Sequence, residues 1–200
     1  MRPIKTFLII GVLMVFISLL THELGHILMA KYFGWRVVEV RLLGFSVYPE
    51  LEFNGLEGSF GKVRPHRDFV SFAEDGWVLL MGSGFNWLIA LGALFVLYLF
   101  KLFRVLNFCL NTIFVFASMM FLDFITYMFG LRLSGGKEPL AAADYLGWNE
   151  SVFFTTALIL GLIHLIAIIY LIITSGYWRN FKMKPDSPYQ TPGTNSQTGL

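Results

Sequence analysis

The sequence predicts a mainly α membrane protein, with about four transmembrane helices and a short β-hairpin region between the first and the second. Hydrophobic residues make up 56% of the 200 residues and charged residues only 14%, with a mean hydropathy of +0.66. Soluble domains carry about 25% charged residues. Four apolar segments are also long enough to cross roughly 30 Å of hydrocarbon. We therefore predict a single polytopic membrane domain over residues 1–181, followed by a disordered polar tail, Lys182–Leu200, which has no apolar periodicity.

The first predicted span is Ile4–Tyr32. Arg2 and Lys5 lie at its start, as basic residues do in secretory signal peptides, but no small-residue cleavage site follows the apolar run. We therefore expect a permanent span. The other three predicted spans are Trp77–Phe100, Val105–Leu131 and Ser151–Tyr177, and all of them carry few or no charges.

A different pattern over Trp35–Arg64 predicts two or three short strands. Val38 and Val40 alternate with charged residues, which is the period of a strand with one buried face. Further along, Asn54-Gly55 is a strong hairpin-turn dipeptide. This β region would separate the first two spans.

Within the first span, the run His22-Glu23-Leu24-Gly25-His26 places two imidazoles and a carboxylate at membrane depth. Residues four apart lie on one face of a helix, so both imidazoles can bind one zinc ion while the carboxylate stands beside them as a general base. A charged residue at the centre of a spanning helix costs roughly 2.5 kcal/mol or more, which favours a functional site over simple packing. The run therefore predicts a metallohydrolase whose active site lies in the bilayer.

A third metal ligand has to come from elsewhere, because a catalytic zinc usually takes three protein ligands and leaves a fourth position for water. Cys109 is the only cysteine, so a thiolate site is excluded, and Asp123 is the only acid in the third span. His22 lies nine residues before the basic end of its span, and Asp123 lies nine residues before that of its own. At 1.5 Å per residue, both lie about 13 Å from the same membrane face. We therefore expect Asp123 to be the third ligand.

Two further polar residues lie in the other spans. Asn86 is nine residues into the second span and so reaches the same layer, where its amide could hold a substrate carbonyl. The small residues of Gly82-Ser83-Gly84 just before it are equally compatible with close helix packing alone. His164, in the fourth span, would lie nearer the opposite face, and we expect a hydrogen-bonded packing residue rather than a ligand.

These three motifs, taken in order, resemble those of the site-2 protease family of intramembrane zinc metalloproteases. They are the His-Glu-Leu-Gly-His run, the Gly-Ser-Gly-Phe-Asn run and Leu122-Asp123, and the resemblance covers roughly Phe7 to Leu131. It implies that the substrates are transmembrane segments of other proteins and that the site is reached from the cytosol. It also implies that Trp35–Arg64 presents the substrate as an added strand.

The resemblance further implies that His22, His26 and Asp123 bind the zinc and that Glu23 activates water. One departure is that the family's Leu-Asp-Gly reads Leu-Asp-Phe here. Divergent members carry a further acidic motif before the last span, to which Glu138 or Asp144 corresponds as an alternative third ligand. Carboxylates at helix starts are common without any metal, so Asp123 stays the first expectation.

The predicted function is a zinc-dependent intramembrane endopeptidase of the cell membrane, with one Zn²⁺ per chain. Its partners would be the lipid bilayer and a transmembrane protein substrate. A net charge of +2 and the lack of a basic run argue against nucleic acid. Two alternatives stay open. One is a divalent-metal transporter, for which four spans are few unless the chain forms a homodimer. The other is a catalytically silent membrane adaptor that retains the zinc motif.

Overall fold

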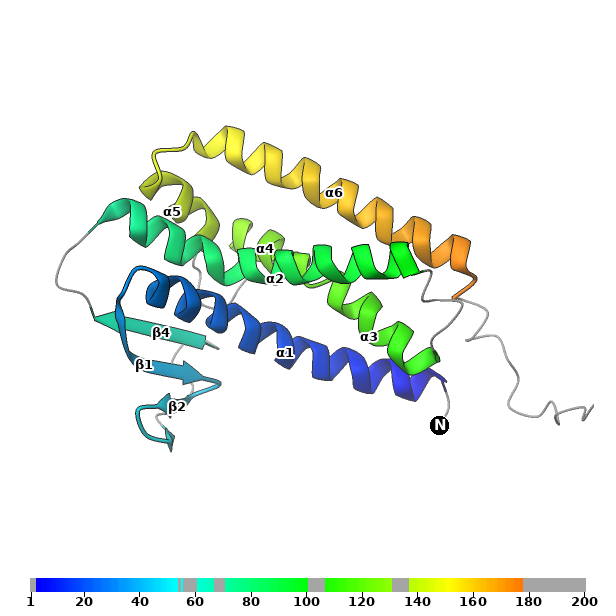
Figure 1. Cartoon of the computed structure of the whole chain (residues 1–200), viewed down its shortest axis with the longest axis horizontal. Helices are drawn as coiled ribbons and strands as arrows, with labels where there is room; N and C mark the ends of the chain where they lie inside the picture. The colour runs from blue at the N-terminus through cyan, green and yellow to red at the C-terminus, as the bar shows by residue number, and fades with distance from the viewer. Residues whose placement is uncertain are drawn as a thin grey trace, which may run out of the picture.

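A computed structural model of the chain describes residues 3–53, 55, 61–66, 71–100, 107–130 and 137–177. Long helices lie side by side, and a small sheet lies beside the C-terminal end of the first helix (Figure 1). The helices are α1 (Pro3–Tyr32), α2 (Phe72–Phe100), α3 (Phe108–Ser118), α4 (Phe121–Met128), α5 (Glu138–Tyr145) and α6 (Glu150–Ser175). The strands are β1 (Arg36–Leu42), β2 (Phe45–Tyr48), β3 (Glu52–Phe53) and β4 (Gly61–His66).

The four predicted spans are confirmed as helical segments that are long and apolar enough to cross a membrane. They are α1, α2, α6 and the segment Phe108–Met128, which contains α3 and α4. Large apolar side chains remain exposed along the outer helices, for example Leu8 in α1 at 60% and Ile163 in α6 at 58%. Such a surface suits contact with lipid rather than water. The predicted tail over Lys182–Leu200 lies outside the described residues.

The third span is interrupted between α3 and α4, at a point where the sequence contains neither Pro nor Gly. The amide of Met120 bonds to the carbonyl of Ala117, a tighter turn than the α-helical pattern. Nε2 of His164 in α6 lies 2.9 Å from the carbonyl oxygen of Ser118, and its ring stacks on Phe121. His164 is therefore a buried packing residue that bonds across helices, as predicted.

The close crossing of α1 and α2 brings the His-Glu-Leu-Gly-His run of α1 next to the Gly-Ser-Gly-Phe-Asn run of α2. A Cβ on Gly25 would collide with the carbonyl of Met81 and would lie 2.8 Å from Cβ of Phe85. Only a glycine therefore permits this approach of the two backbones. Helix α1 then ends at Tyr32, where Gly34 takes a left-handed conformation (φ 74°).

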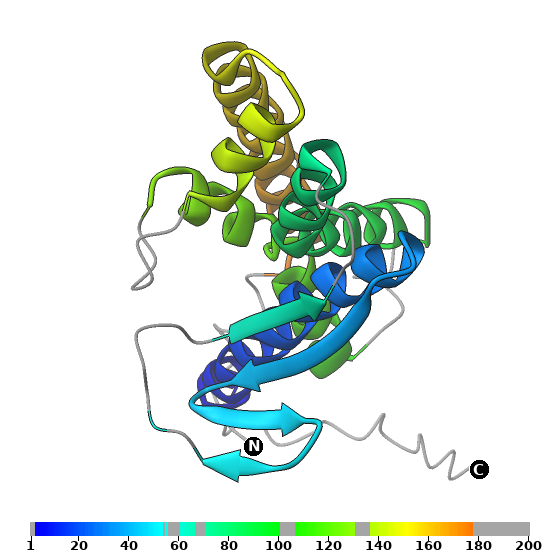
Figure 2. The ribbon, with the colours of Figure 1, turned by 90° about the vertical axis from the view of Figure 1, so that its left-hand side faces the viewer.

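The β region forms one antiparallel sheet with the strand order β3-β2-β1-β4 (Figure 2). Leu43 and Gly44, both with positive φ, make the two-residue turn between β1 and β2. The sheet has four strands, where the sequence predicted two or three. The additional strand is β3, which is hard to recognise because it has only two residues. Strand β4 contains Pro65, which an edge strand tolerates. Nε1 of Trp35 donates to Glu74 of α2 and ties the sheet to the helices.

Helix α5 is too short to span a membrane and packs against α2, with its alanines buried at Ala142 and Ala143. Figure 1 shows it between α2 and α6, at the same end of the bundle as the sheet. Pro139 lies in its first turn, where a missing amide hydrogen costs nothing. This position brings the first residue of α5, Glu138, toward α1.

Candidate functional site

The two imidazoles of α1 face each other through their Nε2 atoms, which lie 3.2 Å apart. Both side chains are buried, with 2% of His22 and 7% of His26 exposed. The four-residue spacing places them on one side of the helix, toward α2 and α5. Two nitrogen donors thus converge on one point inside the bundle.

Contacts at the Nδ1 atoms orient both rings. Nδ1 of His22 lies 2.7 Å from Oδ2 of Asp123 in α4, and Nδ1 of His26 lies 2.7 Å from the carbonyl oxygen of Val78 in α2. Each contact accounts for the Nδ1 proton and leaves Nε2 as the donor to a cation. The ring of Tyr127 stacks on His22, with centroids 4.7 Å apart.

Glu138 supplies a third donor to the same point. Its Oε2 lies 3.2 Å from Nε2 of His22 and 3.7 Å from Nε2 of His26. Donors arranged tetrahedrally about a zinc ion at 2.0–2.1 Å would be about 3.3 Å apart. The buried group of His22, His26 and Glu138 could therefore hold a metal ion with little adjustment. Burial alone would raise the pKa of Glu138, but the hydrogen bonds and charges of the two imidazoles outweigh it and lower the pKa to about 2.

Gly82 of α2 packs directly against the two imidazoles. A Cβ at this position would lie 2.8 Å from Nε2 of His22 and closer still to the ring of His26. Only a residue without a side chain therefore permits the two imidazoles to occupy these positions. The neighbouring Gly84 has no such constraint, because a Cβ there would meet nothing within 4 Å.

Asp123 meets His22, as the depth count predicted, but it meets the far side of the ring. Its carboxylate contacts Nδ1, while the converging donors lie at Nε2, and Asp123 is not part of the three-donor group. The geometry therefore offers Glu138, the alternative candidate, as the third donor. Asp144, the other alternative, is exposed on α5 and also lies outside the group.

Asn86 lies behind Asp123 rather than at an open surface. Its side chain is fully buried, and Nδ2 donates to Oδ2 of Asp123 at 2.9 Å and to the carbonyl oxygen of Ser18 at 2.9 Å. Its Oδ1 accepts from the hydroxyl of Thr21. The amide that the sequence suggested for a substrate carbonyl is thus engaged in a chain of contacts from α1 through Asp123 to His22.

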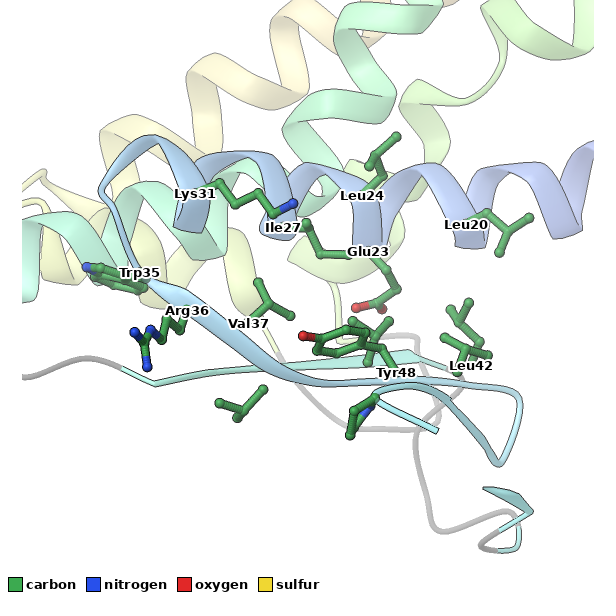
Figure 3. Close-up of a pocket in the computed structure, with 14 residues that line it drawn as sticks. Leu20, Glu23, Leu24, Ile27, Lys31, Trp35, Arg36, Val37, Leu42 and Tyr48 are labelled. Carbon is green, nitrogen blue, oxygen red and sulfur yellow. The ribbon is translucent and has the colours of Figure 1, made fainter. Parts of the chain in front are cut away.

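Glu23 lies between this buried group and a groove. It is only 6% exposed, and its Oε2 has no hydrogen-bond partner among the described residues. The side chain points from α1 toward the strands, and Tyr48 lies across the groove from it (Figure 3). A buried carboxylate oxygen without a partner is costly unless a function retains it.

The groove is a cavity of about 1050 Å³ between α1 and the first two strands. Apolar side chains dominate its lining, and its charged residues are Glu23, Lys31 and Arg36. Within the described residues, β3 pairs only with Phe45 and Ser46. Val47 and Tyr48 of β2 line the groove, and in the strand order β3-β2-β1-β4 the edges of the sheet are β3 and β4.

Sequence reasoning missed Val78 and Gly82 as parts of the site. Gly82 belongs to a small-residue run that the sequence did single out, so the signal was present, but its reading as helix packing was equally plausible. Val78 contacts His26 through its backbone carbonyl, and every residue type has a backbone carbonyl, so the sequence does not single out this position. Comparisons of the chain with protein-family models, with curated proteins and with solved structures find no match. The case for a function therefore depends on the residues and their geometry.

Proposed function

We propose that this protein is a zinc-dependent intramembrane endopeptidase that cleaves membrane-spanning segments of other proteins. One observation carries the proposal. Two imidazoles and a carboxylate converge inside a bundle of membrane-length helices, beside Glu23, which lines a groove and whose Oε2 has no hydrogen-bond partner among the described residues. Buried ionisable groups at such depth are expensive and are a default sign of function. The resemblance to the site-2 protease family points to the same activity.

We assign His22, His26 and Glu138 as the zinc ligands, with Asp123 as a positioning residue. The donor set of two imidazoles and one carboxylate is the type found in zinc hydrolases, and it leaves a fourth position open. Asp123 would hold His22 in the tautomer that presents Nε2 and would raise its basicity. Asn86 would in turn fix Asp123 through its amide. This assignment departs from the site-2 protease pattern, in which the Asp of the third motif is a ligand.

Glu23 is the proposed general base. Zinc, when bound, supplies Lewis-acid chemistry that can lower the pKa of water from 15.7 to about 7. The carboxylate of Glu23 would take a proton from the attacking water, hold it at Oε2 and deliver it to the nitrogen of the leaving amine. The new C–O bond forms first, and the peptide C–N bond then breaks as its nitrogen receives the proton from Glu23. The buried position of Glu23 at the groove wall gives it access to a bound peptide and limits bulk water.

The groove would hold the substrate in an extended form. A transmembrane helix hides its carbonyls in internal hydrogen bonds, so cleavage requires local unwinding. An edge of the sheet would replace those hydrogen bonds by strand addition. The apolar lining suits a segment that comes from the bilayer.

Replacement of Glu23 by Gln tests the proposal most directly. Wild type and Glu23→Gln would be purified, their zinc content measured by mass spectrometry, and both reconstituted in vesicles with a single-span substrate. We expect equal zinc content, and a loss of cleavage of at least about 100-fold, which is the usual contribution of a general base. Glu50→Gln, an exposed acid beyond β2, is the matched control and should cleave normally.

The other functions have different outcomes in the same preparation. Zinc binding without cleavage of any membrane substrate by the wild type would favour the silent adaptor. Zinc-dependent proton flux across the vesicles without cleavage would favour the transporter. A Glu23→Gln protein that cleaves at the wild-type rate would contradict the proposal.

A further inference from the structure

The groove along α1 has two chemically different ends, and Glu23 lies between them. Figure 3 shows Leu20 and Leu42 toward one end, and Lys31 and Arg36 toward the other. The leucines lie on the side of the membrane interior, because they are level with the part of α1 that precedes Glu23. The cations lie toward the C-terminal end of α1. The groove is therefore apolar on one side of the base and cationic on the other.

Neither cation is neutralised by another residue in the part of the chain that the structure describes. Within the described part of the chain, Lys31 and Arg36 make no ion pair, and both are exposed. The sheet does contain such a pair elsewhere, since Arg41 bonds to Glu39. The groove thus holds two positive charges that have no ion-pair partner among the described residues. They lie next to apolar side chains, at the level where an apolar span would emerge from the bilayer.

We propose that the groove selects substrates by charge: a segment in which the apolar span ends in an acidic residue on the side of the scissile bond nearest the C-terminal end of α1. The inference rests on the proposed peptidase function and names its substrate class. Lys31 is eight residues beyond Glu23, or about 12 Å along the helix. An extended peptide advances about 3.3 Å per residue. The acidic side chain therefore lies within about four residues of the bond that is cut.

The alternative binding partner of Lys31 and Arg36 is an anionic lipid headgroup, since basic residues often anchor span ends at the membrane interface. The arrangement on α1 favours the substrate. Leu20, Leu24, Ile27 and Lys31 share one face of the helix at intervals of three and four residues, and all line the groove together with Glu23. Lys31 thus continues the row of side chains that a bound peptide would contact.

Three designed substrates test the inference. Each has an apolar stretch of about 20 residues, and they differ only in carrying Glu, Gln or Lys at the end of that stretch. Cleavage by the wild type would be measured in vesicles of neutral lipid only, which removes anionic headgroups. Capture would be measured separately, by photocrosslinking of each substrate to the Glu23→Gln protein. The same two assays would be run on the variant Lys31→Glu/Arg36→Glu, with Lys62→Glu in β4 as the control, because Lys62 is exposed and does not line the groove.

We expect the wild type to cleave and capture the Glu substrate about 1.5- to fivefold better than the Lys substrate, which is the range for exposed ion pairs. The order should reverse in the double variant and persist in Lys62→Glu. Equal rates for the three substrates, or an order unchanged in the double variant, would overturn the inference while leaving the peptidase intact. Absence of capture for all three would overturn it too. Charge-ordered capture without any cleavage by the wild type would support the inference and reject the peptidase.

Discussion

The two faces of the second half of α1 differ in burial, although a single five-residue motif serves both. The face toward α2 and α5, which we call the donor face, carries His22 and His26. The Nδ1 atoms of both rings are in hydrogen-bond contact, and the two Nε2 atoms point toward each other. The face toward the sheet carries Leu24 and Ile27, and it borders an open cavity. Glu23 has access to both. One helix thus presents a buried set of metal-ligating side chains and a groove on opposite faces, with the single carboxylate of Glu23 lying between them.

The sharpest way to break the donor face is to remove Glu138. We expect Glu138→Ala to lose stoichiometric zinc, because two imidazoles alone leave the site one ligand short. Asp144→Ala, which removes an exposed acid from the same helix, should keep the metal. Zinc quantification on the purified proteins decides between them. Full zinc content in Glu138→Ala, with loss in Asp123→Ala, would return the third ligand to Asp123.

A methyl group at Gly82 should disable the donor face without removing any ligand. Its Cβ would intrude on both imidazoles, so we expect Gly82→Ala to retain little zinc and little cleavage. Gly84→Ala is the matched control on the same helix, since a Cβ there meets nothing within 4 Å. Substrate crosslinking should survive in both proteins, because the groove lies on the other face of α1. Normal zinc binding by Gly82→Ala would show that the ion does not lie at the converging Nε2 atoms.

Loss of Asp123 should weaken the donor face rather than abolish it. A carboxylate that holds a ligating imidazole contributes about 10- to 100-fold in metal affinity. We expect Asp123→Ala to bind zinc that much less tightly in competition with a chelator, with partial recovery in Asp123→Asn, which can still bond to the ring. A variant that binds no zinc at any concentration would identify Asp123 as a ligand.

The smallest effect is expected far from both faces. Replacement of His164 by Leu removes the hydrogen bond to the Ser118 carbonyl at the break between α3 and α4. We expect a loss of about 0.5 to 2 kcal/mol in the free energy of unfolding, as for interhelical hydrogen bonds in membranes. An unfolding titration in detergent measures this loss of free energy. The zinc affinity of the variant should stay at the wild-type value. A loss of zinc in this variant would show that the site depends on the helix break.

Much of the site could be predicted because the rise per residue of a helix is constant, so the number of residues from the end of a span gives the depth of a side chain in the membrane. The count from the span ends placed His22, Asn86 and Asp123 in one layer, and the structure brings them into contact. The same count cannot say which ring atom an acid reaches, since that depends on how the helices are rotated about their axes. Asp123 was therefore placed correctly in depth while its contact fell on Nδ1 rather than beside Nε2.

The remaining features depend on chain segments that sequence periodicity describes poorly. Glu138 begins a short helix, and its local sequence is indistinguishable from that of a solvated helix start. Only the folding of α5 against α2 brings it within 3.2 Å of His22, a residue 116 positions away. Similarly, β3 is hard to recognise because it has only two residues, and the break at Met119 and Met120 has no breaker residue.

The short helix α5 has a consequence for how the protein matures. Two of the proposed ligands belong to a span, but the third belongs to a segment that never crosses the bilayer. A cation bound by all three ligands would cross-link that segment to the transmembrane bundle. Metal binding and packing of α5 against the bundle would then be one coupled equilibrium. A shortage of the ion would therefore weaken the packing of α5 as well as remove the proposed activity.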